Sequence, residues 1–349
     1  MTLPIVWFVV VAFFWTGFFV LEGFDFGVGA LHTVVGRTDI ERRVAINTIG
    51  PVWDGNEVWL VVAGAAMFAA FPDWYASWFS ALYLALWLLL AALIVRGVSF
   101  EFRGKRDTDR WRSTWSATLT VGSVVAPLLF GVGLGDLLTG LPIDADGNYT
   151  GTFVDLLTPY GLWVGLTLLA LCLWHGATFL GIRCTGVVLQ RAVRLQLRLS
   201  IVASVLVLGF AVWTYLLARP GAAGVIVLAV PLLAALIGAA LARSTSGTGR
   251  EFAATAVAIG GTVAALFANL YPNVLVSATD PANTLTVASA SSSPYSLQVM
   301  TIVAAVFVPF VLAYQAWTYY MFRARVIGPR ESPVVARIRS GGPAGDPMP

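Results

Sequence analysis

Charged residues are scarce in this sequence: Asp, Glu, Lys and Arg make up only 11% of its 349 residues, while 58% are hydrophobic. About a quarter of the residues of a soluble domain are usually charged, and an aqueous core cannot bury so much apolar surface. The shortage of charge therefore excludes a soluble globular protein and predicts an all-α, polytopic membrane protein with lipid as its solvent. The net charge of +3 sits in short segments between apolar runs, which excludes a nucleic acid as partner.

Histidine and cysteine are also rare, with two residues of each. The cysteines form neither a CxxC pair nor a CxxCH haem-attachment motif, so we predict no metal site in this chain. Two histidines are too few to ligate several haems. For His175, inside an apolar run, an axial haem ligand and a hydrogen-bonded packing residue are both open, and packing is favoured. His32 is expected at the water edge, as an ordinary interfacial histidine rather than a ligand.

Long apolar runs are what the sequence has in abundance. A helix needs about 20 apolar residues to cross a bilayer. Nine runs approach or exceed that length: 4–32, 54–71, 76–98, 113–138, 156–182, 200–218, 222–242, 252–271 and 296–322. We therefore predict nine transmembrane helices in one domain over residues 1–327. Residues 328–349, rich in Pro, Gly and Arg, are predicted to form a disordered cytoplasmic tail.

The basic residues orient the predicted spans. Nineteen of the 21 lysines and arginines fall in five segments, which are 33–53, 99–112, 183–199, 243–251 and the tail. These segments alternate with segments that are nearly bare of basic residues. Because cytoplasmic loops carry the excess of Lys and Arg, the alternation predicts nine spans with the N-terminus outside and the C-terminus in the cytoplasm. Eight or ten spans would break it.

The first predicted span carries ionisable residues, which are costly inside a membrane and mark functional sites. Glu22, Asp25, Gly29 and His32 share one helical face, because they are three or four residues apart. Asp25 lies roughly 12 Å from the cytoplasmic end of the span, at about 1.5 Å per residue. Burial favours the neutral form of a carboxyl unless a cation lies beside it, so such a group can carry a proton. The alternative is that Asp25 pairs with Arg96 of the third span and only locks two helices together.

The second predicted span opens with Trp-Asp-Gly-Asn-Glu-Val-Trp, residues 53–59. Asp54 as N-cap with Glu57 three residues later would make a capping box. Alternatively, the two carboxyls collect protons at the cytoplasmic mouth, and both interpretations stay open. The charged residues within the spans are concentrated in the cytoplasmic half, which indicates a dead-end path into the protein from the cytoplasm.

Residues 21–72 closely resemble subunit II of the cytochrome bd quinol oxidases. Three motifs carry the resemblance: GFDFGVG at the end of the first span, ERR before an Ile-Asn pair, and WDGNEVW. Similar segments follow in order, including Arg96 with Phe-Glu-Phe-Arg after it, Trp111-Arg112, and Tyr314-Gln315-Ala316-Trp317. The resemblance covers nearly the whole chain.

The resemblance implies a non-haem subunit that pairs with a similarly folded subunit I. Subunit I is expected to hold the b and d haems and the quinol-oxidising loop, and the complex is expected to reduce O2 to water with cytoplasmic protons. Asp54 matches the family's proposed site of proton uptake. A structural quinone, menaquinone or ubiquinone, a small accessory subunit and contact with quinol and lipid are also implied, in a bacterial plasma membrane. Glu57 departs from the family pattern and adds either a second proton carrier or a cap.

A proton-coupled secondary transporter is the rival hypothesis, because buried polar residues and Gly or Pro breaks suit that class too. The sequence shows no clear inverted repeat and no helices broken at matched positions. Its outer half also lacks the charges that alternating access of a proton would need. The observations therefore favour the oxidase subunit, with Glu22, Asp25, Asp54, Glu57 and Arg96 as the candidate proton pathway.

Overall fold

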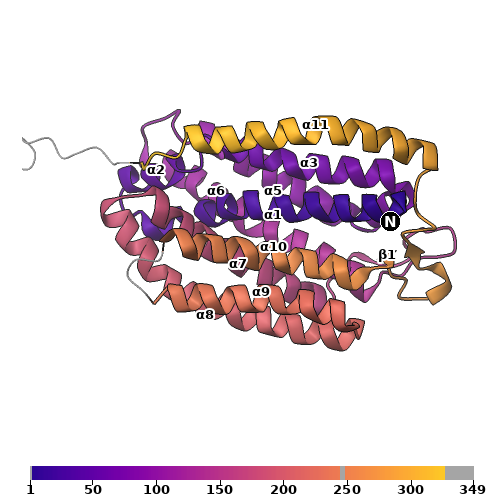
Figure 1. Cartoon of the computed structure of the whole chain (residues 1–349). Helices are drawn as coiled ribbons and strands as arrows, with labels where there is room; N and C mark the ends of the chain where they lie inside the picture. The colour runs from indigo at the N-terminus through magenta and orange to yellow at the C-terminus, as the bar shows by residue number, and fades with distance from the viewer. Residues whose placement is uncertain (1, 244–247, 327–349) are drawn as a thin grey trace, which may run out of the picture.

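The computed structural model describes residues 2–243 and 248–326 as a bundle of long α-helices (Figure 1). Its α-helices are α1 Leu3–Val35, α2 Asp39–Asn47, α3 Trp53–Ala70, α4 Pro72–Ala81, α5 Tyr83–Phe102, α6 Asp109–Thr139, α7 Pro159–Arg183, α8 Gly186–Ala218, α9 Ala222–Leu241, α10 Thr248–Leu270 and α11 Pro294–Met321. Two 3₁₀ turns, Phe153–Leu156 and Pro281–Asn283, and an antiparallel pair of short strands, β1 Asn273–Leu275 and β2 Leu285–Thr286, complete it. The all-α prediction is confirmed, and the predicted tail at 328–349 lies outside the described residues.

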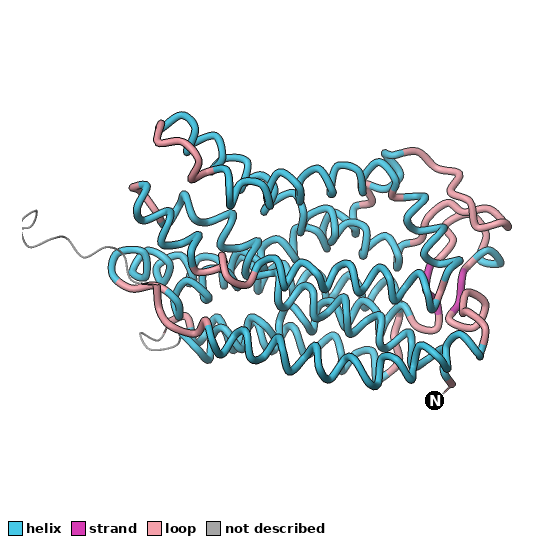
Figure 2. Tube along the Cα trace, turned by 90° about the horizontal axis from the view of Figure 1, so that it is seen from above, coloured by secondary structure: helices cyan, strands magenta, loops and turns pink. Residues whose placement is uncertain are grey.

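The long helices lie side by side along one axis, with α2 at one end of the bundle and the β strands at the other (Figures 1 and 2). We call these the α2 end and the β end. The predicted cytoplasmic segments are at the α2 end. At the β end, loop residue Leu141 pairs with Ser277, and Ser292 donates backbone and side-chain hydrogen bonds to the carbonyls that end α3. The segment between α10 and α11 therefore contains a small β structure.

Eight helices of the described residues are long and apolar enough to span a membrane: α1 and α5 to α11. The predicted second span forms α3, a helix of 18 residues that is not among those eight. Its first turn carries three polar side chains, which lowers its hydropathy. The count of nine spans and the orientation of the termini thus stay predictions.

Two predicted boundaries are wrong. The run 76–98 is interrupted at Leu82, which ends α4 and begins α5. The segment 183–199 was expected to be a loop, but α8 begins at Gly186. Buried Ala192, Gln196 and Ser200 follow each other at helical spacing there, and exposed arginines occupy the other face. Hydropathy marks such an amphipathic stretch as a loop because its arginines outweigh its apolar face.

Helix α1 lies at the centre, packed against α3, α6, α7 and α10. Glycines such as Gly27 make this possible. A Cβ at Gly27 would lie 2.0 Å from the carbonyl oxygen of Cys172 and 2.7 Å from the Cα of Gly176 on α7. Close backbone contact of this kind is typical of small residues in membrane helices. It places the polar face of α1 inside the protein.

Candidate functional site

Arg96 of α5 is fully buried and lies at the centre of the charged cluster. Its Nη2 is 2.6 Å from Glu22 Oε1 on α1, and its Nη1 is 3.8 Å from Glu57 Oε2 on α3. The guanidinium also lies over the rings of Phe26 and Phe100, 4.7 and 5.5 Å from their centroids. Gly122 of α6 leaves the space for Arg96, because a Cβ there would be 2.7 Å from the Arg96 Cβ. Three helices thus hold one buried cation beside two carboxyls.

Asp25 does not pair with Arg96, so the alternative of an Asp25–Arg96 ion pair is wrong. Its Oδ2 accepts a 2.6 Å hydrogen bond from the amide nitrogen of Asn56 on α3. Glu22 and Asp25 both lie on the predicted face of α1, but Asn56 approaches from α3 and donates a hydrogen bond to Asp25. Glu22 is left as the ion-pair partner of the arginine.

The capping box that was one of the two open interpretations of Asp54 and Glu57 does not form. Helix α3 begins at Trp53, so its N-cap is Val52, and no side chain caps it. Asp54 is exposed, and the Glu57 side chain is 22% exposed and reaches towards Arg96. These carboxyls therefore form a series from the surface at Asp54, through half-buried Glu57, to fully buried Glu22.

Asn56, Gln315 and Tyr319 belong to this site and were not singled out as site residues in the sequence. Asn56 is fully buried, and its amide oxygen accepts hydrogen bonds from Gln315 Nε2 at 2.9 Å and from the Tyr319 hydroxyl at 2.7 Å. The signal available was weak: Asn56 lies within WDGN, and Gln315 lies within the YQAW segment of α11. Neither is ionisable, so a search for charged residues inside spans passes over them.

The two histidines are packing residues in the structure. His175 Nδ1 is 2.7 Å from Thr255 Oγ1, and Nε2 is 3.2 Å from the carbonyl oxygen of Val20, so both ring nitrogens have protein partners. His32 is fully buried, with Nδ1 2.7 Å from the Gly29 carbonyl oxygen. The expectation that His32 lies at the water edge is wrong, because α1 continues to Val35 and α2 follows directly.

Asp136 is a buried carboxyl near the β end that the sequence analysis did not single out. Its Oδ1 accepts a 2.6 Å hydrogen bond from the hydroxyl of Thr158, which also caps α7. Because Asp136 is fully buried, the outer half of the bundle is less bare of acids than expected. It lies near the C-terminal end of α6 and links that helix locally to α7.

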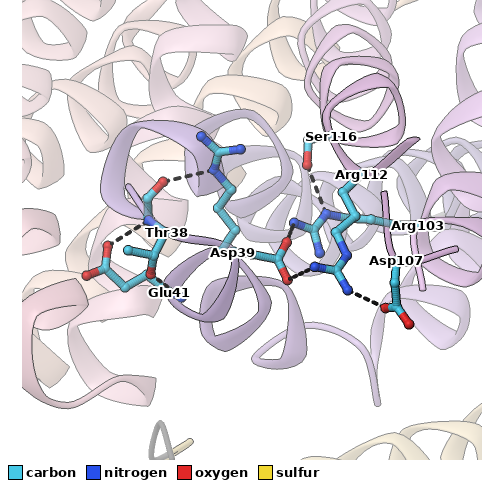
Figure 3. Close-up of polar contacts among 9 residues, drawn as sticks. Thr38, Asp39, Glu41, Arg103, Asp107, Arg112 and Ser116 are labelled. Atoms are coloured by element: carbon cyan, nitrogen blue, oxygen red, sulfur yellow. Dashed lines mark hydrogen bonds and ion pairs between the residues drawn. The ribbon is translucent and has the colours of Figure 1, made fainter. Parts of the chain in front are cut away.

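At the α2 end, ion pairs tie α2 to two other parts of the bundle. Figure 3 shows Asp39 between Arg103 and Arg112 of the α5–α6 region, with Arg103 Nη2 2.5 Å and Arg112 Nη1 3.5 Å from the carboxylate. On the other side, Glu41 accepts a 2.6 Å hydrogen bond from Arg191 of α8. We call these contacts the α2 clamp. They place the ERR motif and two of the predicted cytoplasmic basic segments in one network.

Partial burial acts to raise the pKa of Glu41, but the hydrogen bonds from Arg191 and from the Arg37 and Thr38 backbone outweigh it. They hold the pKa of Glu41 below its ordinary value of 4.5. Glu41 is therefore ionised at neutral pH, as its ion pair requires.

The charge of the buried cluster determines its chemistry. The cluster holds three carboxyls, Glu22, Asp25 and Glu57, and a single guanidinium, so full ionisation would leave two excess negative charges in or near the core. Unpaired buried charge is costly, and the cheaper state holds a proton on a carboxyl. The arrangement can therefore hold a proton on one of its carboxyls. Among the described residues, no group of three or more His, Cys, Asp or Glu side chains could hold a metal ion.

Comparison with known proteins places this geometry in context. The family profile "Cytochrome bd terminal oxidase subunit II" matches residues 3–322. The chain is 42% identical over 324 residues to cytochrome bd ubiquinol oxidase subunit 2 of Bacillus subtilis (strain 168), covering 92% of this chain and 96% of the relative. It is 36% identical over 363 residues to cytochrome bd-I ubiquinol oxidase subunit 2 of Escherichia coli (strain K12), covering 93% and 95% of the two chains. Its fold is similar to a chain of the bd oxidase from Geobacillus thermodenitrificans, with a TM-score of 0.76, 17% identity, and 92% and 99% coverage.

Proposed function

The chain belongs to the cytochrome bd terminal oxidase subunit II family, and from this premise we propose that it supplies cytoplasmic protons to the O2-reducing partner subunit. It is a membrane subunit of a quinol oxidase, an oxidoreductase of the bacterial inner membrane. The single observation that supports the proton role best is the series of carboxyls from exposed Asp54 and half-buried Glu57 to buried Glu22 beside Arg96. Asp25 continues this series one helical turn from Glu22.

In the proposed pathway, Asp54 collects protons at the surface and Glu57 passes them to the Glu22–Asp25 pair. Arg96 stabilises whichever of the neighbouring carboxyls is ionised, so a proton can move without leaving an unpaired charge. Each transfer breaks one O–H bond and forms another. The orientation that makes the α2 end cytoplasmic comes from the positive-inside distribution of arginines and is part of the proposal.

Partnership with subunit I follows from the family, and the b and d haems are proposed to lie in that partner. Helix α11 has an exposed apolar surface and only Leu297 of its residues is buried, so it has room for a protein or lipid neighbour. An apolar cavity of about 530 Å³ between α3, α4, α5 and α6 suits the chain of a lipid or of a bound menaquinone or ubiquinone. The accessory subunit stays a prediction.

A proton-coupled transporter is not favoured. The family match and the two curated relatives, each covering more than nine-tenths of this chain, favour the oxidase subunit instead. A transporter would also need access to the buried acids from both sides, whereas the carboxyl series opens towards the α2 end.

Replacing Asp54 by Asn in the assembled complex tests the proton role. We expect normal haem content and O2 consumption that is slower by at least about tenfold, because a positioned proton carrier is lost. Asp54 caps no helix, so loss of a cap cannot explain a slower rate. Asp73→Asn, an exposed acid in the first turn of α4, is the matched control and should leave turnover unchanged.

Glu57→Gln is the second arm of this test, because half-buried Glu57 can take up a proton in place of Asp54. If both single variants and the double variant turn over at the rate of the parent complex, the pathway through α3 is refuted.

A further inference from the structure

The amide of Asn56 makes every hydrogen bond of which a side-chain amide is capable. Its nitrogen donates to Asp25 Oδ2 at 2.6 Å and to the Leu21 carbonyl oxygen at 3.2 Å. Its oxygen accepts from Gln315 Nε2 and the Tyr319 hydroxyl of α11. A buried amide with four partners has one orientation and cannot rotate without losing several of these bonds.

The partners of this amide themselves determine which of its two atoms is the nitrogen. The Leu21 carbonyl can only accept a hydrogen bond, so the amide atom beside it must be the NH₂ group. The same NH₂ group faces Asp25, which makes Oδ2 of Asp25 an acceptor in both charge states. When Asp25 is neutral, its proton is therefore favoured on Oδ1, because the carbonyl oxygen of a carboxyl accepts a hydrogen bond better than its hydroxyl oxygen does.

Oδ1 of Asp25 is buried and, among the described residues, has no hydrogen-bond donor. The carboxyl of Glu22 lies one turn earlier on the same face of α1, where a hydrogen bond to Oδ1 would join the two carboxyls, and both Glu22 oxygens also lack an aligned donor. Two carboxyls side by side can form such a bond only if one of them carries a proton. The Glu22–Asp25 pair is thus built to share one proton, with Arg96 on the Glu22 side.

We propose that Asn56, held by Gln315 and Tyr319 of α11, is a positioning residue that fixes the exchangeable proton of Asp25 on Oδ1, facing Glu22. This inference deepens the proposed proton pathway and rests on it for its role in turnover. In the transfer step, the O–H bond of Glu22 breaks, an O–H bond forms at Asp25 Oδ1, and the Glu22 carboxylate is left paired with Arg96.

Helix α11 is attached to the bundle at both ends, which links its position to the way Asp25 is held. At the β end, α11 accepts hydrogen bonds from the Trp7 indole through Leu297 and Thr301, and at the α2 end it bonds Asn56. The charged and titratable groups facing Asp25 are Glu22 on its own helix, Arg96 of α5, Glu57 of α3 and Tyr319 of α11. A contact that shifts α11 would therefore change how Asp25 is held.

Infrared difference spectroscopy of the assembled complex tests this positioning directly. The carbonyl stretch of protonated Asp25, assigned by its absence in Asp25→Asn, should be present at neutral pH. In Asn56→Ala and in the double variant Gln315→Leu with Tyr319→Phe, we expect the band to move to higher frequency, because Oδ2 loses its hydrogen bond. Turnover should fall by roughly tenfold, the factor that corresponds to one hydrogen bond to a charged group. Tyr320→Phe, an exposed neighbour outside this network, is the control.

The outcomes separate this inference from the proton pathway. If the band is absent, or moves in Asn56→Ala but not in the α11 double variant, positioning by α11 is refuted. If the band moves as expected but Asp25→Asn leaves turnover unchanged, the geometry stands and the proton pathway fails. Tyr319→Phe alone keeps the ring and serves where the double variant does not assemble.

Discussion

A guanidinium buried among membrane helices needs a carboxylate beside it, and Arg96 takes Glu22 rather than Asp25. The sequence places both acids on one face of α1, so it predicts that the arginine meets one of them. It cannot choose between them, because the choice depends on Asn56, which approaches Asp25 from α3. Residue types and faces could thus be predicted here, while pairings set by a third helix could not.

Arg96→Ala should destabilise the assembled complex by about 3–5 kcal/mol, because it leaves Glu22 buried without a cation. We expect a lower temperature of haem loss in a thermal ramp of the purified complex. Adding Glu22→Gln to Arg96→Ala should recover part of the loss, because a neutral amide is cheaper to bury than a carboxylate.

The matched comparison is Arg96→Ala with Asp25→Asn. Asp25 makes no ion pair with the arginine, so this second change should recover less than Glu22→Gln does. Equal recovery by the two acids would contradict the pairing seen in the structure.

Among the helices, the crossing of α1 and α7 is the contact least tolerant of added volume. Several glycines lie on α1, but the sequence could not say which of them meets another helix. Gly27 and Gly176 meet backbone to backbone, whereas Gly64 of α3 has nothing within 4 Å of its missing Cβ. Glycine content alone does not distinguish such positions, because a glycine facing lipid and a glycine at a crossing look alike in the sequence.

Gly27→Ala should therefore destabilise the complex by about 1–3 kcal/mol or prevent its assembly, as overpacking of a close contact does. Gly64→Ala is the matched control and should be tolerated. Haem content of membranes and the midpoint of thermal unfolding measure the difference. A Gly27→Ala complex as stable as the Gly64→Ala complex would show that the crossing can widen at little cost.

The α2 clamp predicts a pH dependence. Because the pKa of Glu41 is held below 4.5 in the folded state, its ion pair stabilises the protein above that pH and is lost as the pH falls through the folded-state pKa. Glu41→Gln should lower the unfolding temperature near neutral pH and change it less in acid below pH 4.5. Glu101→Gln, at an exposed acid outside the clamp, is the control and should follow the parent at every pH. Parallel curves for Glu41→Gln and the parent would contradict the prediction.

For the molecule as a whole, the bundle architecture was accessible from hydropathy, since eight of the nine apolar runs each lie largely within one helix. The helix number was not, because the run 76–98 crosses the break between α4 and α5. The structured β end was not, because its contacts join loop residues such as Leu141 and Ser277 that lie far apart in the chain. Asp136 was also passed over, because it lies within three residues of the end of its helix, where an acid has no evident partner in the sequence.

The number of spans depends on α3. Its first turn is polar, and unlike eight other helices of the described residues it is not apolar enough to be identified as a span by hydropathy. Exposed Arg43 and Asp73 flank this helix, and Cys172 and Cys184 are buried, so single cysteines at the flanks report on it cleanly. We predict that Asp73→Cys is labelled by a membrane-impermeant maleimide added to intact cells, whereas Arg43→Cys is labelled only after the membrane is opened. An Asn283→Cys variant in the β-end loop should be labelled in intact cells, as Asp73→Cys is. If both flanks of α3 react alike, α3 does not cross the membrane, and the alternation of basic segments no longer supports nine spans. The carboxyls in the first turn of α3 then cannot open to the cytoplasm while the β end faces outside.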